Sequence, residues 1–292
     1  MNKILLTGGT GFIGSHVLEI LVNNGYDVIL LKKSSSDLAK IKFLEGKFSV
    51  CNIDIESEYL TLFQDNAIET IIHVATQYGS QMELSSILEA NVLFPLRLIE
   101  NGKNNGLRYF INTDSFFSKS DTYTYLNHYS NSKKIFKNIL TQITKDNLKV
   151  VNLQLEHVFG EKDNETKFVP YILDKLINNI EKIDLTLGEQ KRDFIYVKDV
   201  AKAYLYTIKE MDQFSGFEDF EIGTGKAISI RKFVTNAKLI SGSTSKLNFG
   251  VLPTRIGEFE ESKANNNFST KTKWFPEFNL QEALKNTINF QK

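Results

Sequence analysis

Several residue types are scarce in this 292-residue chain, and each shortage excludes a class of protein. The single cysteine, Cys51, excludes an internal disulfide, and its place in the apolar run 48–51 predicts a buried thiol rather than a catalytic one. The 35 basic residues balance 35 acidic ones, so no global field attracts nucleic acid or an anionic membrane. No apolar run approaches the ~18 residues of a membrane span, and the first residues lack the features of a secretory signal. We therefore expect a cytoplasmic protein with no nucleic-acid or membrane partner.

A glycine-rich turn follows an apolar run near the start of the chain. Residues 3–7 fit a buried strand, and apolar residues return at helical spacing after the glycines. Gly8 permits a tight turn, Gly11 lets a pyrophosphate approach the backbone, and Gly14 lets the helix pack close to the sheet. The pattern predicts a dinucleotide site, although a glycine turn that binds nothing is the alternative. The candidate residues are Gly8, Thr10, Gly11, Phe12, Ile13 and Gly14.

The loop after the next strand indicates which dinucleotide is bound. Residues 27–31 read as a second strand, which is followed by Lys32, Lys33 and Ser34, with no carboxylate before Asp37. An acidic residue at this position favours NAD, whereas basic residues accommodate the 2′-phosphate of NADP. The sequence therefore favours NADP(H), and a solvated loop that happens to be basic is the alternative.

Two further strands are expected to end at the same cofactor. Residues 48–55 are expected to form the third strand, and Asp54 and Ile55 stand at its end. The carboxylate of Asp54 could accept a hydrogen bond from the adenine amino group, or it could cap the following helix. Residues 70–76 form the fourth strand. Its small terminal residues allow the backbone to pass close to a dinucleotide, and they are Val74, Ala75 and Thr76.

No metal site is predicted. His73 stands inside an apolar strand with no other metal-type ligands nearby, which indicates a core histidine. A helix is expected over residues 84–105, with Asn91 in its middle and a kink at Pro95.

A pair of motifs in the middle of the chain indicates redox chemistry. A strand at 108–112 runs into the hydroxyl residues Thr113 and Ser115, and Tyr129 and Lys133 follow. Tyrosine and lysine at i and i+4 share one helix face, where the lysine can stabilise the phenolate, lower its pKa from about 10 and hold the nicotinamide ribose. The tyrosine can then exchange a proton with a carbonyl or alcohol oxygen while nicotinamide exchanges hydride with the carbon.

Together with the glycine turn, these motifs resemble the short-chain dehydrogenase/reductase superfamily, in its extended epimerase/dehydratase branch. The resemblance implies that Tyr129 and Lys133 are catalytic and also touch the cofactor. Either Ser115 or Thr113 is the catalytic hydroxyl, and the strand alignment favours Ser115. The branch carries RxxNVYGP where this chain has Gln154 and His157, so His157 is a candidate for cofactor and sugar contacts.

The alternation of strands and helices predicts an α/β fold, a Rossmann-type doubly wound parallel sheet with a smaller, partly interleaved C-terminal substrate lobe. We expect a dinucleotide-binding domain at 1–158 and a substrate lobe at 159–292, with about 190–212 returning to the first domain. Arg192 is the expected clamp on a sugar-nucleotide diphosphate, or else it forms an ion pair. The residues 263–273 read as a polar connection. The full set of substrate-binding candidates is Tyr78, Ser115, Phe116, His157, Lys167, Phe168, Arg192, Arg255 and Glu258.

Within the branch, the chain resembles CDP-abequose synthases, through residues 75–79, 112–117, 155–160, 167–172 and 186–200. This resemblance implies NADPH-dependent reduction of the C4 ketone of a CDP-linked 4-keto-6-deoxy or 3,6-dideoxy hexose in the synthesis of O-antigen deoxysugars. The resemblance to the extended branch implies a homodimer. No Asp-Glu pair stands where a 4,6-dehydratase requires it. An NAD-dependent 4-epimerase and a non-catalytic dinucleotide-binding regulator are the alternatives.

Overall fold

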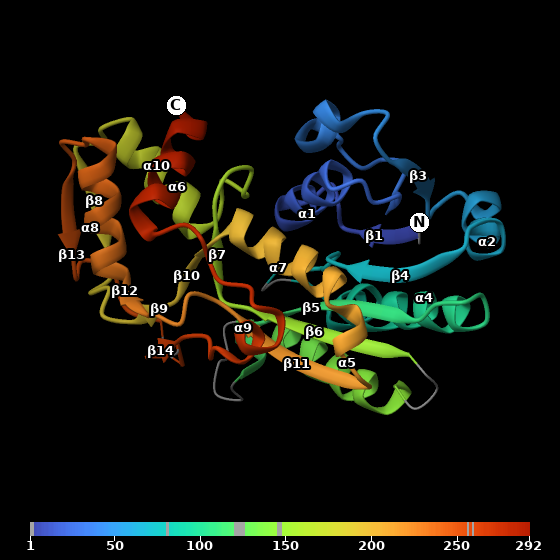
Figure 1. Ribbon diagram of the computed structural model, residues 1–292. Coiled ribbons are helices and arrows are strands. Elements are labelled where there is room, and N and C mark those ends of the chain that lie inside the picture. The colour runs from blue at the N-terminus through green and yellow to red at the C-terminus, as the bar shows by residue number, and fades with distance from the viewer. Residues whose placement is uncertain (1–2, 80–81, 120–125, 145–147, 256, 259) are drawn as a thin grey trace.

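A seven-stranded parallel sheet organises the protein, seen in a computed structural model that describes residues 3–79, 82–119, 126–144, 148–255, 257–258 and 260–292 (Figure 1). The strand order is β11-β6-β5-β4-β1-β2-β3, and every neighbouring pair is parallel. The strands are β1 (Lys3–Thr7), β2 (Val28–Lys32), β3 (Ser49–Asn52), β4 (Ile68–His73), β5 (Tyr109–Ser115), β6 (Lys149–Leu155) and β11 (Phe217–Ile222).

The order of the strands reverses at β1. The chain runs outward from β1 to β2 and β3, and then continues on the other side of β1 with β4, β5 and β6. In such sheets ligands bind beyond the carboxyl ends of the strands at this reversal. The predicted doubly wound fold is confirmed, and the crevice lies beside the glycine turn that follows β1.

Helices cover both faces of the sheet. On one face α1 (Phe12–Asn23) and α7 (Val197–Lys209) bury their apolar sides against β1, β2 and β6. On the other face α2 (Glu56–Asp65), α4 (Phe94–Lys103) and α5 (Asn127–Ile143) form a second core. Because the strands are buried on both faces, their sequences are nearly continuous apolar runs.

The second lobe has its own apolar core and lies at one end of the sheet (Figure 1). It contains three helices, α6 (Phe168–Ile177), α8 (Ile230–Ser241) and α10 (Leu280–Gln291). Its short strands are β7 (His157–Phe159), β8 (Lys182–Leu185), β9 (Lys191–Arg192), β10 (Phe194–Tyr196), β12 (Ile228–Ser229), β13 (Lys246–Phe249) and β14 (Glu261–Ser262). The chain enters this lobe through β7, directly after β6.

The two lobes are interleaved along the chain. After β10, α7 packs against α1, and β11 then joins the large sheet beside β6. The chain returns a second time, because Phe268 and Trp274 are buried in the core beneath α7. The return to the sheet therefore extends from Val197 through Ile222 and again to Trp274.

Two segments differ from the sequence-based expectation. The helix over 84–105 is divided into α3 (Leu84–Leu88), a π-helical turn, η2 (Glu89–Leu93), and α4. Pro95 lacks an N–H group for the carbonyl of Asn91, four residues earlier, which explains why the regular helix is interrupted at this point. The residues 263–273 are not a simple polar connection, because α9 (Asn267–Thr272) lies within them and Phe268 is buried against Phe220 and Trp274.

The expected core residues lie where the sequence places them. His73 is buried, and its Nδ1 lies 2.8 Å from the hydroxyl of Thr7, so its prediction as a core histidine is confirmed. Cys51 is a buried thiol. Within the described ranges, no group of three or more His, Cys, Asp or Glu side chains is arranged to hold a metal ion. No helix in the described part of the chain is long and apolar enough to cross a bilayer.

Candidate active site

The turn between β1 and α1 has room for backbone only. Gly8 has a φ of 73°, and a Cβ there would lie 2.5 Å from the backbone nitrogen of Ala75. A Cβ on Gly14 would lie 2.1 Å from the carbonyl oxygen of Gly8. Gly11 is the N-cap of α1 and offers no side-chain cap, so the free N–H groups of the first turn face the crevice. This is the arrangement that fits a pyrophosphate, because the N–H groups and the helix dipole both favour an anion.

The end of β4 is held close to this turn. The hydroxyl of Thr7 accepts a hydrogen bond from the N–H of Ala75 at 3.2 Å. The same hydroxyl contacts His73, whose pKa is lowered to about 3 by burial and, to a smaller extent, by Lys133. His73 is therefore neutral at physiological pH and serves to fix the strand ends. Val74 and Ala75 follow β4 with their backbone next to Gly8, and Thr76 comes directly after them.

The loop after β2 combines two lysines with a carboxylate. Lys32 Nζ donates to Asn52 Oδ1 at 2.9 Å. Asp54 accepts hydrogen bonds from the N–H and the hydroxyl of Ser34, at 2.7 and 2.6 Å, which lower its pKa. Ile55, not Asp54, is the N-cap of α2, and no side chain caps it, so the suggested capping role of Asp54 is wrong. Lys32, Ser34 and Asp54 thus lie together at the carboxyl ends of β2 and β3.

Tyr129 and Lys133 lie on the buried face of α5, one turn apart. Ser115 and Thr76 lie near the phenol of Tyr129 and act to lower its pKa, but burial is the larger effect and raises the pKa above its usual range. The expectation that the pKa of Tyr129 is lowered is therefore wrong. The reason is that the ring is buried in apolar surroundings that disfavour the phenolate.

Lys133 is buried beside the tyrosine. Its Nζ lies 5.8 Å from the centroid of the Tyr129 ring and donates to the carbonyl oxygen of Thr113 at 2.8 Å. Burial lowers the pKa of Lys133 to about 8, and the carboxylate of Asp114 opposes this shift. The backbone of β5, at Thr113, therefore holds the ammonium group in place.

The two candidate hydroxyls at the end of β5 have different surroundings. Ser115 lies beside the Tyr129 phenol. The hydroxyl of Thr113 lies 2.6 Å from the hydroxyl of Tyr204, a fully buried residue of α7. The side chain of Thr113 is thus engaged in the core beneath α7, while its carbonyl holds Lys133.

Asn91, which was not among the predicted site residues, connects these parts. Its carbonyl oxygen accepts from the Gln77 N–H at 2.7 Å and from the Thr76 hydroxyl at 3.2 Å. Its amide donates to the Gln77 carbonyl and to the Ser132 hydroxyl, both at 3.0 Å. A fully buried asparagine in the middle of an apolar helix was the signal that could have identified it, because buried amides require partners.

Aromatic rings surround the tyrosine. Tyr78 and Phe117 meet the ring of Tyr129 edge-on, with centroids 5.1 and 6.3 Å away. Phe116 stacks near Phe117, at 4.1 Å, and lies 6.0 Å from His157. The pKa of His157 is lowered to about 3, mainly by burial and also by Arg192 and Lys167, so this side chain is neutral. The wall beside the phenol is therefore largely apolar and uncharged.

The cationic candidates lie farther into the second lobe. Arg192 is buried, donates to the Lys191 carbonyl at 2.8 Å, and lies 3.7 Å from a carboxylate oxygen of Glu258. The structure therefore brings together Arg192 and Glu258, two predicted substrate residues. Lys167 lies 5.4 Å from the ring of Phe12, just before Phe168 begins α6, and so close to the glycine turn. Arg255 is exposed in the loop before β14.

The comparisons with known proteins agree with this geometry. The model of the NAD dependent epimerase/dehydratase family matches residues 4–223. The chain belongs to this family. It is 37% identical to the CDP-abequose synthase of Salmonella muenchen, over 100% of this chain and 98% of that protein, and 34% identical to that of Salmonella typhimurium strain LT2, over 98% and 97%. The resemblance to CDP-abequose synthases is confirmed.

A solved structure places the fold in the same family. The UDP-glucose 4-epimerase of Thermotoga maritima, determined with UDP-glucose, superposes with a TM-score of 0.86 at 25% identity and covers 99% of this chain and 98% of that one. The family that matches this chain is described as NAD dependent. In the present chain the glycine cradle and the uncapped start of α1 fit a dinucleotide pyrophosphate.

Proposed function

We propose that this protein is an NADPH-dependent reductase of the C4 ketone of a CDP-linked 4-keto-6-deoxy or 3,6-dideoxy hexose. The observation that carries the proposal is the meeting of Ser115, Tyr129 and Lys133 at the end of β5. The similarity to CDP-abequose synthases along the whole chain supports the choice of reaction and of nucleotide.

The state of the tyrosine suits reduction. Because burial raises the pKa of Tyr129, the phenol is protonated at neutral pH and can donate its proton to the ketone oxygen O4. Ser115 holds that oxygen beside the phenol. A bound nicotinamide supplies the hydride that C4 receives. The ammonium of Lys133 stabilises the phenolate that remains after proton donation, because opposite charges attract strongly where water is excluded.

The remaining candidates have roles in binding. Lys32, Lys33 and Ser34 would hold a 2′-phosphate, and Asp54 keeps Ser34 in place while it stays available to the adenine amino group. Arg192 and Arg255 would bind the sugar diphosphate, with Glu258 orienting Arg192. The apolar wall next to Tyr129 suits a hexose that lacks hydroxyl groups.

The proposal is tested by NADPH oxidation with a panel of 4-keto-6-deoxy sugar nucleotides that differ in the base and in the substituent at C3. We expect turnover with the CDP-linked 3,6-dideoxy sugar and weaker turnover with UDP and dTDP analogues. Absence of NADPH oxidation with every member of the panel would overturn the proposal.

A 4-epimerase is the second candidate, and the similarity to the Thermotoga maritima enzyme favours it. An epimerase retains NAD through its cycle, whereas a reductase exchanges NADPH. The cofactor content of the purified protein separates the two: copurified NAD(H) supports the epimerase, and a protein free of cofactor that consumes NADPH supports the reductase. A non-catalytic regulator would bind the dinucleotide and convert none of the sugars.

We further propose that the protein acts in surface-polysaccharide deoxysugar synthesis as a homodimer. The side chains of Leu93 and Ile135 support the dimer, since both are apolar and exposed. Leu93 comes directly before α4 and Ile135 lies in α5, two helices that cover the same face of the sheet. Sedimentation of the purified protein tests it, and a monomer at micromolar concentration would contradict it.

A further inference from the structure

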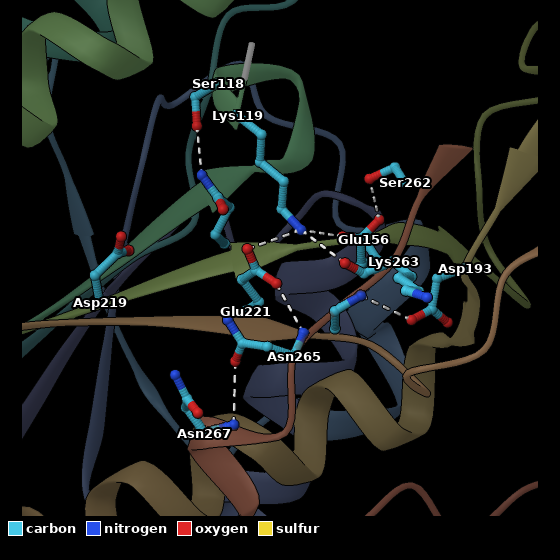
Figure 2. A network of polar contacts seen from close by, with 12 residues as sticks. Ser118, Lys119, Glu156, Asp193, Asp219, Glu221, Ser262, Lys263, Asn265 and Asn267 are labelled. Atoms are coloured by element: carbon cyan, nitrogen blue, oxygen red, sulfur yellow. Dashed lines mark hydrogen bonds and ion pairs between the residues drawn. The ribbon is translucent and has the colours of Figure 1, made fainter. Parts of the chain in front are cut away.

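An ion pair behind the active site joins the two lobes. Lys119 ends η3 (Phe116–Lys119), the short 3-10 helix after β5, and its ammonium group reaches Glu156 at the end of β6 (Figure 2). The same ammonium lies 3.0 Å from Glu221 of β11 and donates to the carbonyl of Lys263 at 3.1 Å. One side chain thus contacts three segments that are distant in the sequence.

Glu156 is the buried partner. Its side chain is 0% exposed, whereas that of Lys119 is 20% exposed. Its second oxygen accepts a hydrogen bond from the hydroxyl of Ser262 at 2.8 Å. A Cβ on Gly223 would lie 2.9 Å from Cγ of Glu156, so the buried carboxylate packs against a position that has room only for glycine. A buried carboxylate is stabilised by a nearby cation, and Lys119 supplies one to Glu156.

The segment that Lys119 ends also carries the wall of the active site. Phe117 contacts the ring of Tyr129, and Phe116 contacts His157. Ser118 ties this helix to Asp114 and receives a hydrogen bond from Gln154 at 2.7 Å. Lys119 is therefore the last residue of the segment that holds these two aromatic rings beside the active site.

The partners of Lys119 on the other side lead to the substrate lobe. Ser262 lies in β14, directly opposite Arg192 of β9 in a parallel pair. Lys263 follows, and Glu221 accepts from the N–H of Asn265 at 2.7 Å, so the whole segment is fastened to β11 (Figure 2). A continuous set of contacts thus runs from Tyr129 through η3 and Glu156 to the strand that carries Arg192.

We propose that Lys119 and Glu156 form a positioning pair. This pair fixes the position of Tyr129 in the first lobe relative to that of Arg192 in the second. The catalytic consequence rests on the proposed function, whereas the coupling of the segments does not. Neither residue touches the reacting atoms. Their effect comes from geometry, because a misplacement of about 1 Å at a reacting centre can cost ~10²-fold in rate.

The test compares Lys119→Met, Glu156→Gln, the double variant and Lys119→Arg. Lys119→Met leaves a buried carboxylate without its cation, so the Tm should fall, and the double variant should recover much of it because no lone charge remains. Turnover should behave differently. We expect kcat/KM for the sugar to fall about 10- to 100-fold in Lys119→Met and in the double variant, with KM for NADPH unchanged, and to be restored in Lys119→Arg.

Hydrogen exchange measures the coupling itself. In Lys119→Met the amides of 116–119 and 261–265 should exchange faster together. Lys271→Met is the matched control, because Lys271 forms a similar part-buried ion pair with Glu218 and contacts neither η3 nor Glu156; it should alter neither exchange in 116–119 nor kcat/KM. Recovery of both Tm and kcat/KM in the double variant would overturn the positioning role, as would unchanged exchange at 261–265. A wild-type protein that converts no sugar would overturn the proposed function alone, because the exchange measurement still tests the pair.

Discussion

Replacement of Tyr129 by phenylalanine tests the centre of the mechanism. The ring of Tyr129 is 7% exposed and lies between Tyr78 and Phe117. The substitution keeps the ring and these contacts, and it removes one hydroxyl group, which lies near Ser115 and Thr76. The fold and the glycine turn should therefore remain intact, since neither depends on that oxygen.

The effects on stability and on rate should differ widely in size. The loss of a buried polar hydroxyl should reduce the free energy of unfolding by about 1 kcal/mol and the Tm by about 2 °C. A protein with about 5–15 kcal/mol of stability remains folded after that loss. The loss of a positioned proton donor should reduce kcat by ~10²–10⁴-fold, which corresponds to about 2.7–5.4 kcal/mol of activation free energy.

The assay is NADPH oxidation with the CDP-linked ketosugar, accompanied by NADPH binding followed by fluorescence. Tyr109→Phe is the control, because it removes a tyrosine hydroxyl, 3.3 Å from Asp212, at the start of β5, whereas the site lies at the end of that strand with Ser115. The control should keep the wild-type kcat. A Tyr129→Phe enzyme with a kcat within threefold of wild type would refute the assignment of the proton donor.

Three further predictions concern the cofactor, the pH profile and the core. Replacing Lys32 and Lys33 by alanine should raise KM for NADPH more than KM for NADH in steady-state kinetics, and equal effects would remove the 2′-phosphate argument. Because Lys133 has a pKa of about 8, the cation that stabilises the phenolate is lost as pH rises, so kcat should decline above about pH 8; a constant kcat up to pH 9.5 would contradict this. Phe268→Ala should reduce the free energy of unfolding by about 3–5 kcal/mol in urea titrations, since its side chain is 1% exposed, and a change under 1 kcal/mol would contradict its place in the core.

The sheet and the glycine turn could be predicted because their signals are local. The continuous apolar runs of β1, β4 and β5 follow from burial on both faces, and Gly8 and Gly14 occur where a side chain would collide with the backbone. The spacing of Tyr129 and Lys133 likewise fixes their shared face. In each case the residues that cause the structure are neighbours in the sequence.

The expectations that were wrong depend on distant partners. The segment 263–273 is polar in sequence, yet Phe268 completes a core built by Phe220 and Trp274. The pKa of Tyr129 is raised by burial, to which the rings of Tyr78 and Phe117 from two separate segments contribute, and the YxxxK spacing carries no information on that burial. Long-range burial therefore overrode a correct local rule.

The choice between Thr113 and Ser115 shows how far alternation along a strand can lead. Residues two apart point to the same face of a strand, so alternation alone places both hydroxyls on the same side, and only the alignment of the strand favoured Ser115. The separation comes from α7, which lies about 90 residues later and places Tyr204 against Thr113. Ser115 is the last residue of β5, two residues beyond that contact, and lies beside the phenol of Tyr129. A helix from the interleaved part of the chain thus occupies one hydroxyl and leaves the other to the phenol, which is why the site depends on the return of the chain to the sheet.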